Sequence, residues 1–79
     1  MDKKVEHYVG LPWRVMIEPE QQDDGTILFV ASHPDFDGIL GTGDTAESAL
    51  TDLERARRSM IEALLAEAYP IPEPSLAAP

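Results

Sequence analysis

The stretch PDFDGILGTGDTAESAL, residues 34–50, joins the two halves of the chain. Its residue types predict a loop, a short strand, a tight turn and then the first turns of the only long helix. Gly41 and Gly43 are expected to bracket the turn, because glycine adopts positive φ angles without steric cost. The segments before this stretch have the character of strands, and the segment after it is helical and ends in a proline-rich tail.

The long helix is expected over residues 45–69. Asp44 or Thr45 can supply a side-chain oxygen for the unpaired amides at its start, and Asp44-x-x-Glu47 has the spacing of a capping box. Both acids would also lie at the positive end of the helix dipole. Pro70 stops the helix because proline cannot donate a backbone hydrogen bond. Apolar residues at helical spacing define one broad face: Ala46, Ala49, Leu50, Leu53, Ala56, Met60, Ile61 and Leu64.

Arg57 falls in the middle of that apolar face. One interpretation is that its stem packs along the sheet while its guanidinium reaches an acid at the rim. The alternative is an ion pair with a second subunit.

Two strands are expected before residue 34. Residues 12–18 alternate along the chain, which is typical of a strand, and residues 26–31 form a second strand that is apolar on both faces. Residues 20–25, which end in Asp-Gly, are expected to form the hairpin connection between them. One face of the sheet would carry Trp13, Val15, Ile17, Ile27 and Phe29, and the other Met16, Leu28 and Val30. A single long helix covers only one face, so an apolar patch should stay exposed on the other, as at protein–protein contacts.

The chain is expected to form one domain over residues 1–79, with a core at 12–69. Residues 1–11 form an arm or short amphipathic helix. Residues 70–79 form an extended tail, or are disordered, and Ile71 is a candidate contact for a second subunit.

The charge is −9, from 15 acidic and 6 basic side chains. Such a chain is repelled by phosphate backbones, which disfavours direct nucleic-acid binding and favours a basic protein partner, although solubility alone is the alternative. There is no cysteine, which by itself leaves the redox compartment open. No apolar run reaches about 20 residues and the N-terminus lacks the apolar core of a signal peptide, so we expect a soluble, cytoplasmic protein without a membrane span. A domain this small is marginally stable unless another chain covers it.

No catalytic, metal or cofactor site is expected. Asp35 and Asp37 partly imitate a calcium loop but are better explained as turn formers. Ser32 and His33 would point to opposite faces of a strand and so cannot pair as nucleophile and base. His7 and His33 are both expected on the surface.

A short helix, three strands and a long helix is also the order of double-stranded-RNA-binding domains, whose last helix begins with lysines that contact phosphates. The sequence DTAES at residues 44–48 would repel that ligand.

The chain resembles the HicB-like antitoxin family, in a short form without a C-terminal DNA-binding domain. FVASHPDFDG (29–38) is similar to the family's aromatic-x-Ala-x-x-Pro-Asp-Leu-Pro-Gly, and GDTAESAL (43–50) to its Gly-Asp-Thr-x-Glu-Glu-Ala. PIPEPS (70–75) is similar to its Pro-Ile-Pro-x-Pro, and Tyr8 and Leu11-Pro12 match its entry segment.

The resemblance implies an α+β fold of partial RNase H-like type, β-β-β-α-β, in which three antiparallel strands pack on one long helix and a C-terminal extended strand follows. It implies a non-enzymatic antitoxin that neutralises a small basic HicA-type mRNA-cleaving toxin and forms a homodimer or homotetramer. An orphan oligomeric scaffold or regulator of the same fold is the alternative. The candidate partner-binding residues are Asp23, Asp24, Asp35 and Asp37. The candidate self-association residues are Met16, Leu28, Val30, Arg57 and Ile71.

Overall fold

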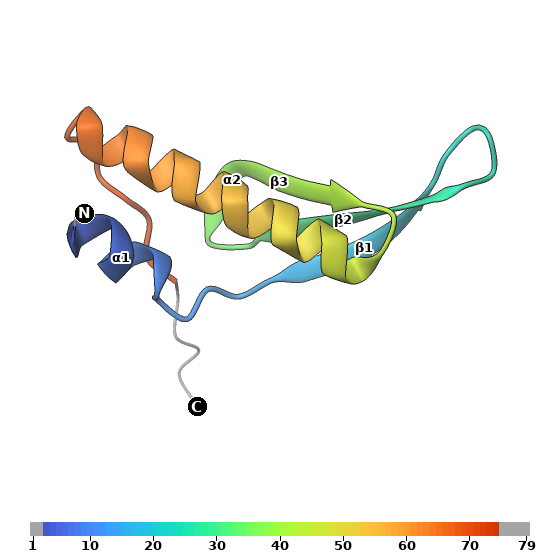
Figure 1. Cartoon of the computed structure of the whole chain (residues 1–79), viewed down its shortest axis with the longest axis horizontal. Coiled ribbons are helices and arrows are strands. Elements are labelled where there is room, and N and C mark those ends of the chain that lie inside the picture. The colour runs from blue at the N-terminus through green and yellow to red at the C-terminus, as the bar shows by residue number, and fades with distance from the viewer. Residues whose placement is uncertain (1–2, 75–79) are drawn as a thin grey trace.

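The chain folds into a three-stranded antiparallel sheet with a long helix across one of its faces (Figure 1). The computed structural model describes residues 3–74. Along the chain the elements are α1 (Lys3–Val9), β1 (Met16–Gln21), β2 (Ile27–His33), β3 (Phe36–Gly43) and α2 (Ala46–Ala66). The strand order is β1-β2-β3, and α1 packs beside the C-terminal half of α2 (Figure 1). The α+β class is as the sequence predicted, and of the two alternatives for residues 1–11, an arm or a short helix, the helix is the one formed.

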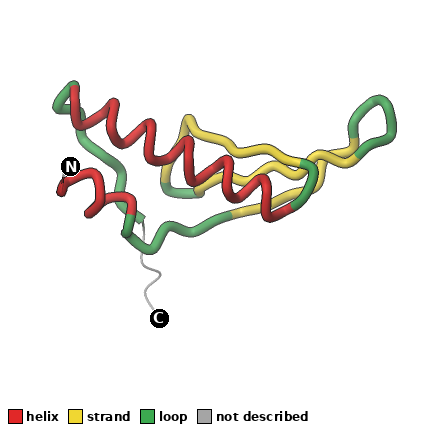
Figure 2. The backbone as a smooth tube through the Cα atoms, in the orientation of Figure 1, coloured by secondary structure: helices red, strands yellow, loops and turns green. Residues whose placement is uncertain are grey.

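Strand β1 begins later and ends later than expected. Residues 12–15 are not part of the sheet, because the Trp13 ring turns back toward α1 and its Nε1 donates to the Tyr8 carbonyl at 2.8 Å. The strand then continues through Pro19, which lies opposite Phe29. Figure 2 shows that the β1–β2 hairpin extends past the N-terminal end of α2.

The prediction that Gly41 and Gly43 form a positive-φ turn is wrong, since both lie in β3. Positive φ occurs instead at Gly25 and Gly38, with angles of 87° and 93°. Gly41 is required by close packing, because a Cβ there would lie 2.6 Å from the Leu53 Cα of α2. The missing side chain therefore lets strand and helix approach each other.

The helix α2 begins with a capping box built by Thr45 and Ser48. Thr45 Oγ1 accepts from the Ser48 amide at 3.0 Å, and Ser48 Oγ accepts from the Thr45 amide at 3.1 Å. Thr45 is thus the cap, and the predicted pairing of Asp44 with Glu47 is not the one formed. The serine replaces the usual Glu or Gln of the motif.

The helix ends at Ala66, short of the expected end at residue 69, in a Schellman motif. The Ala68 amide donates to the Leu65 carbonyl, and the Tyr69 amide donates to the Leu64 carbonyl. Ala68 occupies the left-handed position that glycine usually takes, with φ at 58°.

The core is small and lies between α2 and the sheet. Its buried apolar residues are Val5, Ala31, Phe36, Ile39, Ala49, Leu53 and Ile61. Within residues 4–74, only Leu53 and Ile61 are both large and fully buried. The expected helix face is confirmed at these two positions and at Ala49, whereas Ala46 is exposed in the first turn.

The tail segment from residue 70 to residue 74 is extended but forms no strand. Pro70, Pro72 and Pro74 lack the amide hydrogens that a sheet ladder needs. The partly buried Ile71 packs against the protein's own core, and Pro74 lies near His7 of α1. The predicted C-terminal strand is therefore absent over these residues, and residues 75–79 lie outside the described part of the chain.

Candidate protein interaction surface

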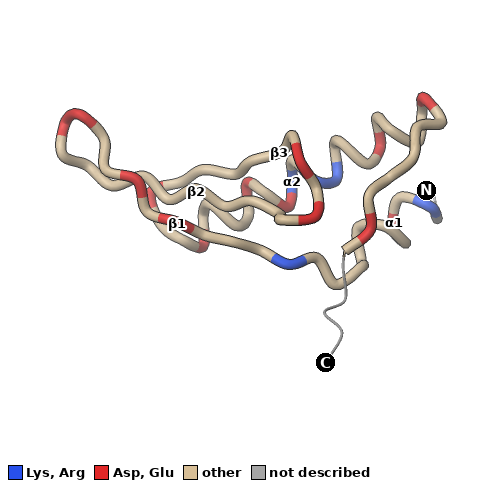
Figure 3. Tube along the Cα trace, turned by 180° about the vertical axis from the view of Figure 1, so that it is seen from behind, with Lys and Arg blue, Asp and Glu red and all other residues tan. Residues whose placement is uncertain are grey.

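One face of the sheet is not covered by any described element, as the view from behind shows (Figure 3). Residues paired across an antiparallel sheet point to the same side. The pairings Met16–Ser32–Leu40, Glu18–Val30–Thr42 and Glu20–Leu28 therefore define this surface. We call these eight residues the open face.

The open face carries an apolar set that no part of the described chain covers. Leu40 is 61% exposed and Met16 is 48% exposed, while Leu28 and Val30 are half-buried. Met16, Leu28 and Val30 lie together, as the strand alternation predicted. Leu40 was not among the residues expected on this face, because face residues were assigned only from the first two strands.

The helix side of the β1–β2 hairpin is also exposed. Ile17 and Ile27 point to the helix side of the sheet, yet they are 37% and 45% exposed. The reason is that α2 lies mainly over β3 and β2 and leaves β1 beyond its edge. Ile27 is exposed because it lies beside the hairpin loop, and the hairpin extends past the N-terminal end of α2. The expectation that one long helix covers this face therefore fails at the hairpin.

Both outer edges of the sheet are partly closed to further strands. Pro19 has no amide hydrogen to offer on β1. On β3, the Thr42 amide donates to the Asp52 carboxylate of α2 at 2.9 Å. Both features hinder the addition of a strand from another chain.

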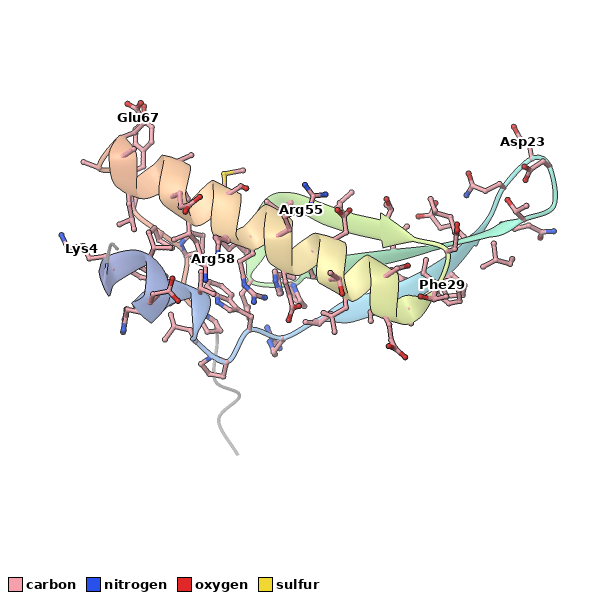
Figure 4. The ribbon with its side chains drawn as sticks, in the orientation of Figure 1. Lys4, Asp23, Phe29, Arg55, Arg58 and Glu67 are labelled. Atoms are coloured by element: carbon pink, nitrogen blue, oxygen red, sulfur yellow. The ribbon has the colours of Figure 1, made fainter. Side chains whose placement is uncertain are left out.

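The four acids proposed for partner binding lie at opposite ends of the sheet. Asp23 and Asp24 are at the tip of the β1–β2 hairpin, where Figure 4 labels Asp23, and Asp35 and Asp37 are at the β2–β3 turn. They therefore cannot form one patch on this chain.

Two of these acids have structural contacts. Asp24 accepts from the Thr26 amide and hydroxyl at 3.0 and 2.6 Å, and these bonds lower the pKa of its carboxyl group. Asp35 accepts two hydrogen bonds from the Arg14 guanidinium, at 3.0 and 2.7 Å. Asp23, Asp24 and Asp37 are exposed, and Asp35 is half-buried.

All four arginines are engaged within the chain. Arg14 pairs with Asp35, Arg55 pairs with Asp52, and Arg58 pairs with Glu6 of α1 at 2.7 Å. The fourth, Arg57, is buried. The lysines at positions 3 and 4 are both on α1. The two lysines of α1 thus lie away from the sheet, whereas Arg14 lies just before β1, beside the end of the open face, and is paired there with Asp35 (Figure 3).

Arg57 and His33 form a buried polar pair between α2 and β2. Their exposed fractions are 8% and 3%, and Arg57 Nη1 lies 3.0 Å from His33 Nε2. Arg57 thus contacts a histidine of its own chain and leaves little surface for a second subunit. This differs from the predicted contact with an acid at the rim.

The expectation that His33 lies on the surface is wrong. Its ring packs 5.6 Å from Trp13, and its Nδ1 lies 2.6 Å from the Arg14 carbonyl. The sequence could have predicted this burial. Alternate residues of a strand point to the same face, and His33 follows Phe29 and Ala31, which point to the core, at that spacing.

The contacts of His33 assign its protonation. Arg57 can only donate, so His33 Nε2 accepts and Nδ1–H donates to the Arg14 carbonyl. Burial, followed by the charge of Arg57, lowers the pKa of His33, and burial also lowers the pKa of Arg57. The Arg57 Nε has no hydrogen-bond partner among the described residues.

The described residues contain no group of three or more His, Cys, Asp or Glu side chains that could hold a metal ion. His33 is buried with both ring nitrogens in contact, so it is not placed to act as a catalytic base. Neither described helix has the length and apolar character needed to cross a bilayer. The open face is thus the surface of this chain with the clearest capacity to bind.

No protein-family model matches the chain, and no characterised protein or solved structure matches it either.

Proposed function

We propose that this chain is a non-enzymatic antitoxin of the HicB-like kind, which binds and neutralises a small basic HicA-type mRNA-cleaving toxin in the cytoplasm. The observation that carries the proposal is an uncovered apolar sheet face on a chain of charge −9. Such a face is typical of protein–protein contact, and the charge would attract a basic protein over long range.

The motifs that resemble the family also have structural positions that support the proposal. The stretch at residues 29–38 spans most of β2, the turn and the start of β3, and residues 43–50 span the end of β3 and the cap of α2. Three antiparallel strands followed by a long helix is the order expected for a partial RNase H-like domain. The proposed relation to that fold rests on this order and on the motifs.

A protein partner is favoured over RNA by charge. The order of α1, three strands and α2 is shared with double-stranded-RNA-binding domains, so topology does not separate the two. The first turn of α2 is preceded by Asp44 and includes Glu47, which would repel a phosphate.

The second candidate is an orphan homodimeric or homotetrameric scaffold without a toxin partner. The exposure of Ile17 and Ile27 favours it, because their side of the hairpin is separate from the open face. Self-association there would leave the open face available, so the two candidates can also hold together.

The test is co-expression with a HicA-type toxin encoded in the same genome. We expect growth to be restored and purified toxin to stop cleaving mRNA at a stoichiometric amount of this chain. Complex formation should weaken as salt rises, because part of the attraction is electrostatic. A protein that neither binds nor inhibits the toxin, and that sediments as a stable oligomer, would favour the scaffold.

A further inference from the structure

The open face has charges of only one sign. Its eight residues include two ionisable side chains, Glu18 and Glu20, both on the edge strand β1. They lie beside an apolar row that runs through Leu28 and Val30 to Leu40. A complementary surface would be apolar with basic side chains along one side.

A second copy of the chain does not provide that complement. In a two-fold dimer the same patch meets itself, so the only ionised groups on the facing surfaces would be the two glutamates of each copy. The arginines cannot complement them, since Arg14, Arg55 and Arg58 are paired elsewhere and Arg57 is buried. Charge complementarity therefore favours a different protein.

The partner is also not expected to add a strand to the sheet. Pro19 interrupts the row of amide donors on β1, and Asp52 occupies the Thr42 amide on β3. A partner would instead lie flat on the face, with side chains contacting side chains.

Resting on the proposed function, we infer that the open face is the docking surface for a partner whose exposed apolar side chains are bordered by lysine or arginine. Met16 and Leu40 are its main apolar contacts and the two glutamates its charged contacts. The hairpin tip and the β2–β3 turn, where the acids first proposed for binding lie, are not the centre of this contact.

The probes are two synthetic amphipathic helices with the same leucine face, one flanked by lysine and arginine and the other by glutamate. Each is titrated into the ¹⁵N-labelled full chain and followed by amide chemical shifts. We expect the basic peptide to shift amides of β1, β2 and β3 around the open face, with weaker binding at higher salt. The acidic peptide should leave these amides unchanged.

Two variants locate the contact. Met16→Ser and Leu40→Ser should each weaken binding of the basic peptide about tenfold, because each removes an exposed apolar side chain that the partner would bury. Ile17→Ser is the control, since Ile17 is the exposed apolar neighbour of Met16 but lies on the other side of the same strand. It should change the affinity less than about twofold.

Several results would overturn the inference. These are an equal loss of affinity in Ile17→Ser, shifts confined to the hairpin tip or to α2, and equal binding of the two peptides. A dimer that sediments as such and dissociates on Leu40→Ser would instead assign the face to a second copy.

Neutralisation assays with the toxin distinguish a failure of this inference from a failure of the proposed function. If Met16→Ser and Leu40→Ser neutralise the toxin as well as the unaltered chain does, the surface is wrong and the function stands. If the unaltered chain fails to neutralise the toxin but binds the basic peptide at the open face, the function is wrong and the surface stands.

Discussion

Replacing Gly41 by alanine should destabilise this protein far more than the size of one methyl group suggests. The added Cβ would lie 2.6 Å from the Leu53 Cα and closer still to two other backbone atoms of α2, the Leu53 nitrogen and the Ala49 oxygen. Ordinary contacts of a Cβ are at 3.4–4 Å, so α2 would have to move away from β3 by about 1 Å. Leu53 and Ala49 are fully buried at this contact, and a gap of that size removes about a quarter to a half of their dispersion energy.

The expected cost is about 3 kcal/mol or more, from overpacking and the lost contacts together. A chain of 79 residues has a free energy of unfolding of only about 4–12 kcal/mol, so Gly41→Ala should remove a large part of it. The midpoint of thermal unfolding, followed by circular dichroism, should fall by at least about 12 °C.

Gly38→Ala is the control for this experiment. Gly38 has a positive φ of 93° but open space around its Cβ position, so alanine there should cost only about 1–2 kcal/mol of backbone strain. A Gly41→Ala variant that unfolds no earlier than Gly38→Ala would refute the claim that β3 and α2 are in backbone contact at this position.

Three further predictions follow from the polar pair and the two helix ends. The folded state holds His33 neutral, with its pKa lowered by burial and by Arg57, so unfolded chains bind its proton more readily. Stability should be full above the ordinary histidine pKa of 6.5 and fall as the pH drops below it, and the urea midpoint of His33→Gln should lose this dependence. Unchanged pH dependence in that variant would place the titration elsewhere. Ala68→Gly should raise the thermal midpoint by about 4–8 °C, because glycine has no penalty at the left-handed position, and a lower midpoint would contradict the Schellman geometry. Thr45→Ala should cost about 1 kcal/mol in urea unfolding by removing the cap, whereas Glu47→Ala, which removes the other expected cap partner, should cost less.

Local sequence patterns predicted the elements well. Helical spacing of apolar residues located α2 and three of its buried positions, and the Asp-Gly pair located the β1–β2 hairpin. These signals depend on residues a few positions apart, which contact one another in any fold that contains the element. The exact ends of β1 and α2 were less predictable. Trp13 bonds back to Tyr8 and does not join β1, and either Asp44 or Thr45 could have capped α2.

The candidate site was predicted only in part. The alternation of side chains along each strand predicted that Met16, Leu28 and Val30 share one face, and the strand pairing confirms it. The length of β3, which adds Leu40, and the ion pair that engages Asp35 depend on contacts that this alternation does not describe.

The sequence by itself determined the α+β class, one long helix, two apolar sheet faces and the acidic charge, because composition and periodicity are properties of neighbouring residues. Only the tertiary structure decided that Gly41 serves close packing, that His33 is buried, and that the arginines are already paired. His33 and Arg57 are 24 positions apart, and Arg58 and Glu6 are 52 apart. Contacts over such separations arise only when α2 packs against the sheet and against α1, and they leave Glu18 and Glu20 of the open face for the basic partner that we propose.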